Sequence, residues 1–160
     1  VCGFRALKDY RMKESNIREI SRMLSAKPEE SAQAVKRLQD EAKSWREKLI
    51  QTQSRAMEQI LENLPEHVEN YLVFKKDVDK NVARRFVDEG KSKCQGICGI
   101  FLGNDEDGYR YILGSESVDL KAFSKTFHET LGGKGGGKGE MMQGTVNASE
   151  ETIRNYIEKK

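Results

Sequence analysis

Apolar positions in the first half of the chain recur with the spacing of α-helices. In residues 5–24 they stand three, four or seven positions apart, at Ala6, Tyr10, Ile17, Ile20 and Leu24. A longer stretch, residues 28–64, keeps a strict three-four repeat at Val35, Leu38, Ala42, Trp45, Leu49, Thr52 and Ala56. Such steps place the side chains on one helix face, and the longer set has the spacing of a coiled-coil seam. The short break between the two stretches predicts an antiparallel helical hairpin.

The second helix is the longer of the two, so the first can cover only part of its seam. The remainder, near residues 52–64, has to pack on the second half of the chain or on another copy of it. We expect this helical arm to be architectural, because nothing in its sequence indicates catalysis.

The second half of the chain alternates between strand-like and helix-like segments. Short apolar runs predict strands at residues 71–74, 96–102, 109–113 and 141–146. Helical spacing covers residues 78–93, 119–131 and a last segment from 149. The order β-α-β-β-α-β-α predicts an α/β (α+β) domain with a mixed sheet. We therefore divide the chain into a helical arm, residues 1–66, and an α/β domain, residues 67–160.

A glycine-rich segment at residues 132–139 interrupts this alternation. Six of its eight residues are glycine, and the other two are Lys134 and Lys138. We predict a loop here, because glycine lets another molecule approach the backbone and its N–H groups can form an anion-binding nest. The lysines would neutralise phosphate charge. The segment is not a nucleotide P-loop, since no Ser or Thr follows the Gly-Lys pair and no helix begins there. A flexible linker is the alternative.

Composition and charge narrow the class of protein. The 160 residues suit one ordinary domain or a small domain with a helical arm, and the longest apolar run, residues 97–102, is far below the roughly 18 residues of a membrane span. Three cysteines do not make a disulfide framework, which fits a reducing cytoplasm. Residues 75–93 and 121–138 each carry a net charge of +3, which suits an anionic partner, although solvated helix surface gives the same pattern. The chain begins at Val1 without Met, so we expect it to be part of a longer protein.

The glycine-rich segment also resembles a family motif. The DHH-associated domain, in the form found with alanyl-tRNA synthetase, has a pattern close to Gly-Gly-Lys/Arg-Gly-Gly-Gly-Lys/Arg-Pro-Asp/Glu-x-Ala-Gln-Gly. The matching residues are Gly132, Gly133, Lys134, Gly135, Gly136, Gly137, Lys138, Glu140, Gln143 and Gly144. Gly139 stands in place of the proline and Met142 in place of the alanine. Residues 1–10 are similar to the junction that follows the editing domain of long-form AlaX-type proteins, and residues 24–30 to a helical turn of the same family.

This resemblance implies a function. The chain would be a non-catalytic tRNA-binding and assembly region of an alanyl-tRNA synthetase-like or trans-editing protein, which deacylates mischarged tRNA(Ala) through an upstream zinc domain. The zinc motifs of that domain, His-x-x-x-His and Cys-x-x-x-His, are absent here: His67 and His128 are far apart, and Cys94 and Cys98 lack a second pair of ligands. Cys2 belongs to the junction. We therefore expect neither catalytic residues nor a cofactor in this chain, and tRNA and a second copy as partners.

The expected RNA-binding residues form two groups. The first is the glycine segment, with Gly132, Gly133, Lys134, Gly135, Gly136, Gly137, Lys138 and Gln143. The second is a basic stripe expected on the helix at 78–93, with Lys76, Lys80, Arg84 and Lys91. Two alternatives stay open, a module that mainly dimerises and the substrate-binding domain of a DHH-type phosphoesterase. The second is disfavoured because Lys138 stands where those enzymes carry histidine.

Overall fold

The computed structural model describes residues 3–65 and 68–159. The chain divides into two compact units, Val1–Leu49 and Ile50–Lys160, and each is described by itself. Cys2 and His67 lie outside the described residues.

The first unit confirms the two long helices. Helix α1 spans Phe4–Met23, a 3₁₀ turn, η1, spans Pro28–Glu30, and α2 spans Ser31–Glu62 and continues into the second unit. Pro28 opens η1, where its missing N–H removes no helical hydrogen bond. The hydroxyls of Ser21 and Ser31 meet at 2.9 Å between α1 and α2. A polar contact of buried serines thus occupies the junction of the two helices.

The expected antiparallel pairing of these helices is corrected by the structure. Apolar side chains of the α2 seam remain open to solvent, with Leu38 56%, Trp45 67% and Leu49 55% exposed. On α1, Phe4 and Tyr10 are also more than half exposed. Helix α1 therefore does not cover the seam of α2. The apolar spacing of α2 is real, but its partner surface is not supplied by α1.

The second unit is built on a five-stranded mixed sheet, as the alternation of segments predicts. Its strands are β1 (Tyr71–Lys75), β2 (Cys98–Asn104), β3 (Gly108–Gly114), β4 (Lys134–Lys138) and β5 (Met141–Val146). The spatial order is β1-β2-β3-β5-β4. Strands β1 and β2 are parallel, and every other neighbouring pair is antiparallel. Strand β4 therefore forms one edge of the sheet.

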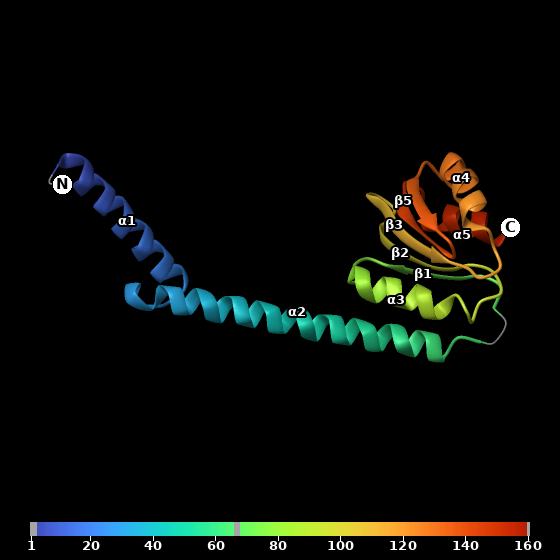
Figure 1. The fold of residues 1–160 in the computed structure, drawn as a ribbon, viewed down its shortest axis with the longest axis horizontal. Coiled ribbons are helices and arrows are strands. Elements are labelled where there is room, and N and C mark those ends of the chain that lie inside the picture. Colours follow the sequence, from blue (N-terminus) through green and yellow to red (C-terminus); the bar gives the residue numbers. More distant parts are fainter. Residues whose placement is uncertain (1–2, 66–67, 160) are drawn as a thin grey trace. The chain divides into compact units, whose positions relative to one another are not determined.

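Helices cover both faces of this sheet, as Figure 1 shows for α3 on one side and for α4 and α5 on the other. Their bounds are α3 Lys80–Gly90, α4 Leu120–Leu131 and α5 Glu150–Glu158. One core joins α4 and α5 to the sheet through side chains such as Phe101, Tyr111 and Phe127. The second core lies under α3, around Phe86 and Ile100, and takes in the last turns of α2.

Polar side chains cap the start of all three helices. Asp79 accepts a hydrogen bond from the amide of Asn81 at the start of α3, and Asp119 accepts from Lys121 and Ala122 at the start of α4. Ser149 accepts from Thr152 at α5. These contacts satisfy backbone donors that have no partner inside the helix.

The prediction of a loop at residues 132–139 is wrong. Residues 134–138 are strand β4, which pairs in register with β5 from Lys134 opposite Thr145 to Lys138 opposite Met141. Only the two ends have the left-handed backbone that favours glycine, Gly132 after α4 and Gly139 in the turn, each at φ 66°. Because the segment between them is extended and paired, its N–H groups do not curl into an anion-binding nest.

Candidate nucleic-acid interface

Strand alternation divides the glycine segment between the two faces of the sheet. Lys134, Gly136 and Lys138 share the face turned toward α3, opposite Thr145, Gln143 and Met141 of β5. Helix α3 covers the centre of this face, but its cover ends before β5 and β4, where Gln143 and Thr145 are exposed. Both lysines therefore lie on a part of the sheet that is left uncovered by the helices of the described residues.

Three adjoining hollows run along this uncovered face, and together we call them the open-face groove. Their volumes are about 390, 420 and 300 Å³. The first and second share Leu102, Arg110 and Thr145, and the second and third share Ile112 and Gln143. The groove therefore follows β3 and β5 continuously toward the β4–β5 turn.

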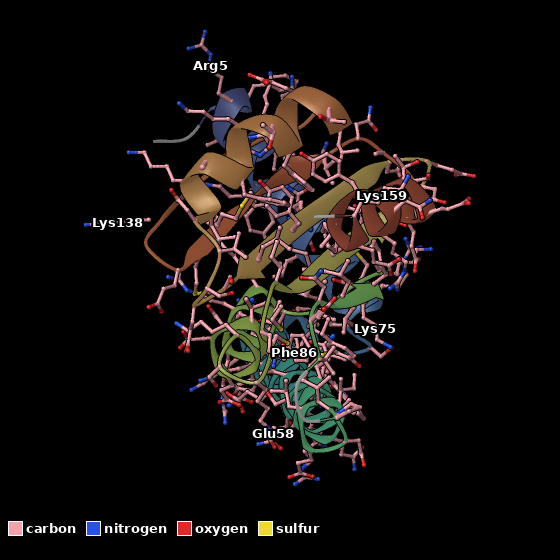
Figure 2. The ribbon with its side chains drawn as sticks, turned by 90° about the vertical axis from the view of Figure 1, so that its right-hand side faces the viewer. Arg5, Glu58, Lys75, Phe86, Lys138 and Lys159 are labelled. Atoms are coloured by element: carbon pink, nitrogen blue, oxygen red, sulfur yellow. The ribbon has the colours of Figure 1, made fainter. Side chains whose placement is uncertain are left out.

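Five exposed cationic side chains line or adjoin the second and third hollows of this groove. Lys80 and Arg84 of α3, Arg110 of β3 and Lys138 of β4 line these hollows, and Lys134 of β4 lies next to them, opposite Thr145. Figure 2 shows Lys138 projecting from the hairpin away from the sheet. Within residues 3–65 and 68–159, none of the five has a carboxylate partner. No Asp or Glu of that part of the chain lines the second and third hollows, whereas Asp107 lines the first.

Two arginines of this unit that lie away from the groove are held by carboxylates. Arg85 contacts Glu58 and Glu89, and Arg154 contacts Glu150. A cation that already has a partner contributes less field to solvent than a free one, so Arg85 and Arg154 add less to the field around the unit than the cations at the groove do.

Glycines on the other face of the β4–β5 hairpin allow the hairpin to pack closely on the residues beneath it. The Tyr111 hydroxyl meets Nε2 of His128 at 2.6 Å beneath the β4–β5 hairpin. A Cβ atom at Gly135 would stand 2.6 Å from that hydroxyl oxygen, and one at Gly144 would stand 2.7 Å from it. Burial raises the pKa of Tyr111 to about 12, so the phenol stays neutral. These two glycines are needed because the hairpin lies directly on the hydroxyl of the buried Tyr111.

Gly136 differs from its neighbours. A Cβ atom at this position would meet nothing within 4 Å, and the residue lines the third hollow of the groove. Its backbone is not left-handed either. The fold therefore gives no reason for glycine at 136, whereas a ligand that approaches the backbone would.

The predicted basic stripe is only partly formed. Lys80 and Arg84 lie one turn apart on α3 and both border the groove. Lys76 precedes the helix, so it is not on the stripe, although it lines the first hollow. Lys91 follows the helix and contacts Glu140 at 2.8 Å and Asp88 at 3.0 Å. The Glu140 hydrogen bond, followed by that of Asp88, raises the pKa of Lys91.

Lys91 therefore does not present the free positive charge that the predicted RNA-binding stripe requires. It ties the β4–β5 turn, through Glu140, to the end of α3. This contact holds the turn beside the groove, and the charge of Lys91 is already paired with carboxylates.

The remaining predicted residues fall on both sides of the hairpin. Gly132 lines the first hollow, and Gly137, Lys138 and Gln143 line the third. Gly133 faces away, where a Cβ atom would stand 2.9 Å from the His128 ring.

The sequence reading missed Arg110 and Thr145 as members of the site. Arg110 stands between the buried Tyr109 and Tyr111, so period-two alternation places it on the opposite face of the strand. That signal is present in the sequence. The pairing of β3 with β5, which sets Arg110 opposite Thr145, cannot be predicted from the sequence pattern.

The two described cysteines are buried free thiols beside β2. The hydrogen bond with Cys94, together with burial, raises the pKa of Cys98 and keeps that thiol protonated. Within the described ranges, no group of three or more His, Cys, Asp or Glu side chains is placed to hold a metal ion. In the same ranges, no helix is both long and apolar enough to cross a membrane.

Together these features define an α/β domain that presents a glycine-rich edge hairpin beside a cationic groove. The DHHA1 domain model matches residues 68–159, which is more than half of the chain, and the chain belongs to this family.

A curated relative extends the similarity into the helical part. The chain is 32% identical over 158 aligned residues to an alanine–tRNA ligase of Magnetococcus marinus, and the alignment covers 90% of this chain. It covers only 18% of the relative, so the chain spans less than a fifth of that protein's length.

Proposed function

We propose that this region binds tRNA through the open-face groove and has no catalytic role of its own. The observation that carries the proposal is the gathering of five cations around the second and third hollows of the groove, none of which has a carboxylate partner among the described residues. RNA backbones carry one negative charge per phosphate, and Lys and Arg contacts to phosphates supply most of the sequence-independent affinity. The name of the relative, an alanine–tRNA ligase, favours tRNA, and tRNA(Ala) in particular, as the ligand.

The longer protein would supply the chemistry. We infer a synthetase-like or AlaX-type editing protein in which a zinc domain outside this sequence deacylates mischarged tRNA(Ala), while this region holds the RNA. The buried free thiols Cys94 and Cys98 support a reducing compartment such as the cytoplasm.

Gly136→Val tests the proposal without disturbing the fold. Valine favours the extended strand, and the position has open space, so we expect a thermal unfolding midpoint equal to or above that of the wild type. The new side chain would keep RNA from the backbone of β4. We expect about a tenfold loss of tRNA affinity, roughly the loss of one hydrogen bond to phosphate, measured by filter binding at fixed salt.

The unfolding midpoint serves as the control in the same preparation. A stable Gly136→Val protein that binds tRNA as the wild type does would show that the ligand does not approach β4.

A second candidate function, assembly of two copies, rests on the exposed seam of α2. Leu38, Trp45 and Leu49 keep coiled-coil spacing and are each more than half exposed. In a parallel pair of α2 helices, Glu41 would lie at the position that faces Arg46 of a second copy. Both the apolar seam and its flanking charges therefore suit a second copy of this chain.

Leu49→Glu should convert such a dimer to a monomer, because the carboxylate would be buried in the seam without a partner. Sedimentation equilibrium at micromolar to millimolar concentrations measures this. Ser44→Glu adds the same charge at an exposed position off the seam and should leave the dimer intact. A wild-type chain that stays monomeric at the highest concentration would exclude assembly as its role.

A further inference from the structure

We propose that the central hollow of the open-face groove accepts one unpaired nucleobase of the bound RNA. This inference rests on the proposed function and adds the kind of RNA feature that is recognised. The hollow is the one of about 420 Å³ between α3 and β5. A heterocyclic base fits this volume with room for its ribose.

The floor of the hollow is apolar. Val78, Leu102 and Ile112 line this floor. Lys80 and Thr145 also line the hollow and supply polar groups to it. Phosphates alone need no such floor, because they are bound through Lys and Arg side chains and other polar donors. An apolar floor inside a cationic rim matches a ligand that has a flat apolar body and carries phosphates on each side. A nucleotide has that composition.

The polar groups at the rim can contact a base. Gln143 and Thr145 stand two residues apart on β5, so they share a face and lie roughly 7 Å apart along the strand. The Gln143 amide offers both a donor and an acceptor to a base edge, and the Thr145 hydroxyl offers either. Both side chains are exposed and available.

Arg110 completes the arrangement. It lies opposite Thr145 in the β3–β5 register and has no carboxylate partner in the described part of the chain. An unpaired guanidinium can stack on a base face as well as contact a phosphate. The remaining cations, Arg84 and Lys138 among them, border the neighbouring hollow, where the next phosphate would lie.

This geometry excludes a base that is paired inside a duplex. Val78 and Lys80, at the start of α3, line one side of the hollow, so a base has to leave its stack to reach the apolar floor. RNA-binding proteins that recognise a sequence generally contact unstacked bases in loops and at chain ends. The ligand feature is therefore an unpaired nucleotide flanked by backbone phosphates.

The experiment compares a single-stranded RNA of mixed sequence with a blunt RNA duplex of equal total charge, using the full 160-residue chain. We expect the single strand to bind about tenfold more tightly at the same salt. Thr145→Trp fills the hollow with a side chain that a strand tolerates, and we expect it to remove this advantage. Because no cation is lost, the salt dependence should keep its slope. Thr130→Trp, on the exposed face of α4, is the matched control.

Gln143→Leu adds a second readout. We expect it to reduce differences in affinity among short homopolymeric RNAs while leaving the duplex unaffected. Equal affinity of strand and duplex, with Thr145→Trp binding as the Thr130→Trp control does, would overturn the base site and leave phosphate binding at the groove standing. No detectable binding of either RNA would overturn the base site, and no detectable binding of tRNA would overturn the proposed function as well.

Discussion

Gly144→Ala is expected to destabilise the α/β domain by about 2–3 kcal/mol, the upper part of the range for overpacking a tight site. A Cβ atom there would stand 2.2 Å from the carbonyl oxygen of Lys134 and 2.7 Å from the hydroxyl of Tyr111. The first contact is backbone of the paired strand, so relief requires β4 to move away from β5. Relief at the second would disturb the Tyr111–His128 hydrogen bond. Denaturant unfolding, with the slope held common to both proteins, measures the change.

Gly136→Ala is the matched control. It lies on the same hairpin but meets open space, so alanine should be neutral or should stabilise the domain by up to about 1 kcal/mol through the unfolded state. If Gly144→Ala were as stable as Gly136→Ala, the close packing of the hairpin on Tyr111 would be contradicted.

The double variant Lys134→Ala, Lys138→Ala is expected to lower tRNA affinity by about 25- to 60-fold at 0.1 M salt. This range follows from two lost phosphate contacts, each of which changes the slope of log K against log salt by about 0.7 to 0.9. The loss should shrink as salt rises, and the slope itself should fall by roughly 1.4 to 1.8. Titrations at several salt concentrations give both quantities.

Lys121→Ala, Lys125→Ala removes the same charge from α4, on the far side of the sheet from the groove. We expect this control to keep the wild-type slope. Equal slopes for the two double variants would mean that net charge, and not the position of Lys134 and Lys138, governs binding.

The sequence predicted most elements because their side chains carry the period of the structure. The apolar spacing at residues 5–24 and 28–64 marked α1 and α2, and the run at 141–146 coincides with β5. The family resemblance at residues 132–144 is confirmed by the DHHA1 match. Each of these signals depends on residues close together in the chain.

Strand β4 was missed because glycine provides no side chain to alternate and is disfavoured in strands. Its conformation comes from pairing with β5, which is a tertiary effect. The groove was missed for a related reason. Lys80, Arg110 and Lys138 are far apart in sequence and meet only through the strand order β3-β5-β4, which no local pattern specifies.

The spacing of residues in the sequence does not predict which side chains form ion pairs or contacts either. Lys91 follows Arg84 by seven residues, as a helical stripe requires, yet its ammonium group contacts Glu140 from the β4–β5 turn. The apolar seam of α2 gave the correct helix but the wrong partner, since spacing describes a surface and not what covers it.

Amide hydrogen exchange of the full 160-residue chain, with and without saturating tRNA, tests the central claim most directly. We predict that tRNA slows exchange in β4, β5 and the first turn of α3, the elements that border the open-face groove. Exchange in α4, on the other face of the sheet, should change little. Protection confined to α4 or to the helices of the first unit, with β4 and β5 unchanged, would contradict the account.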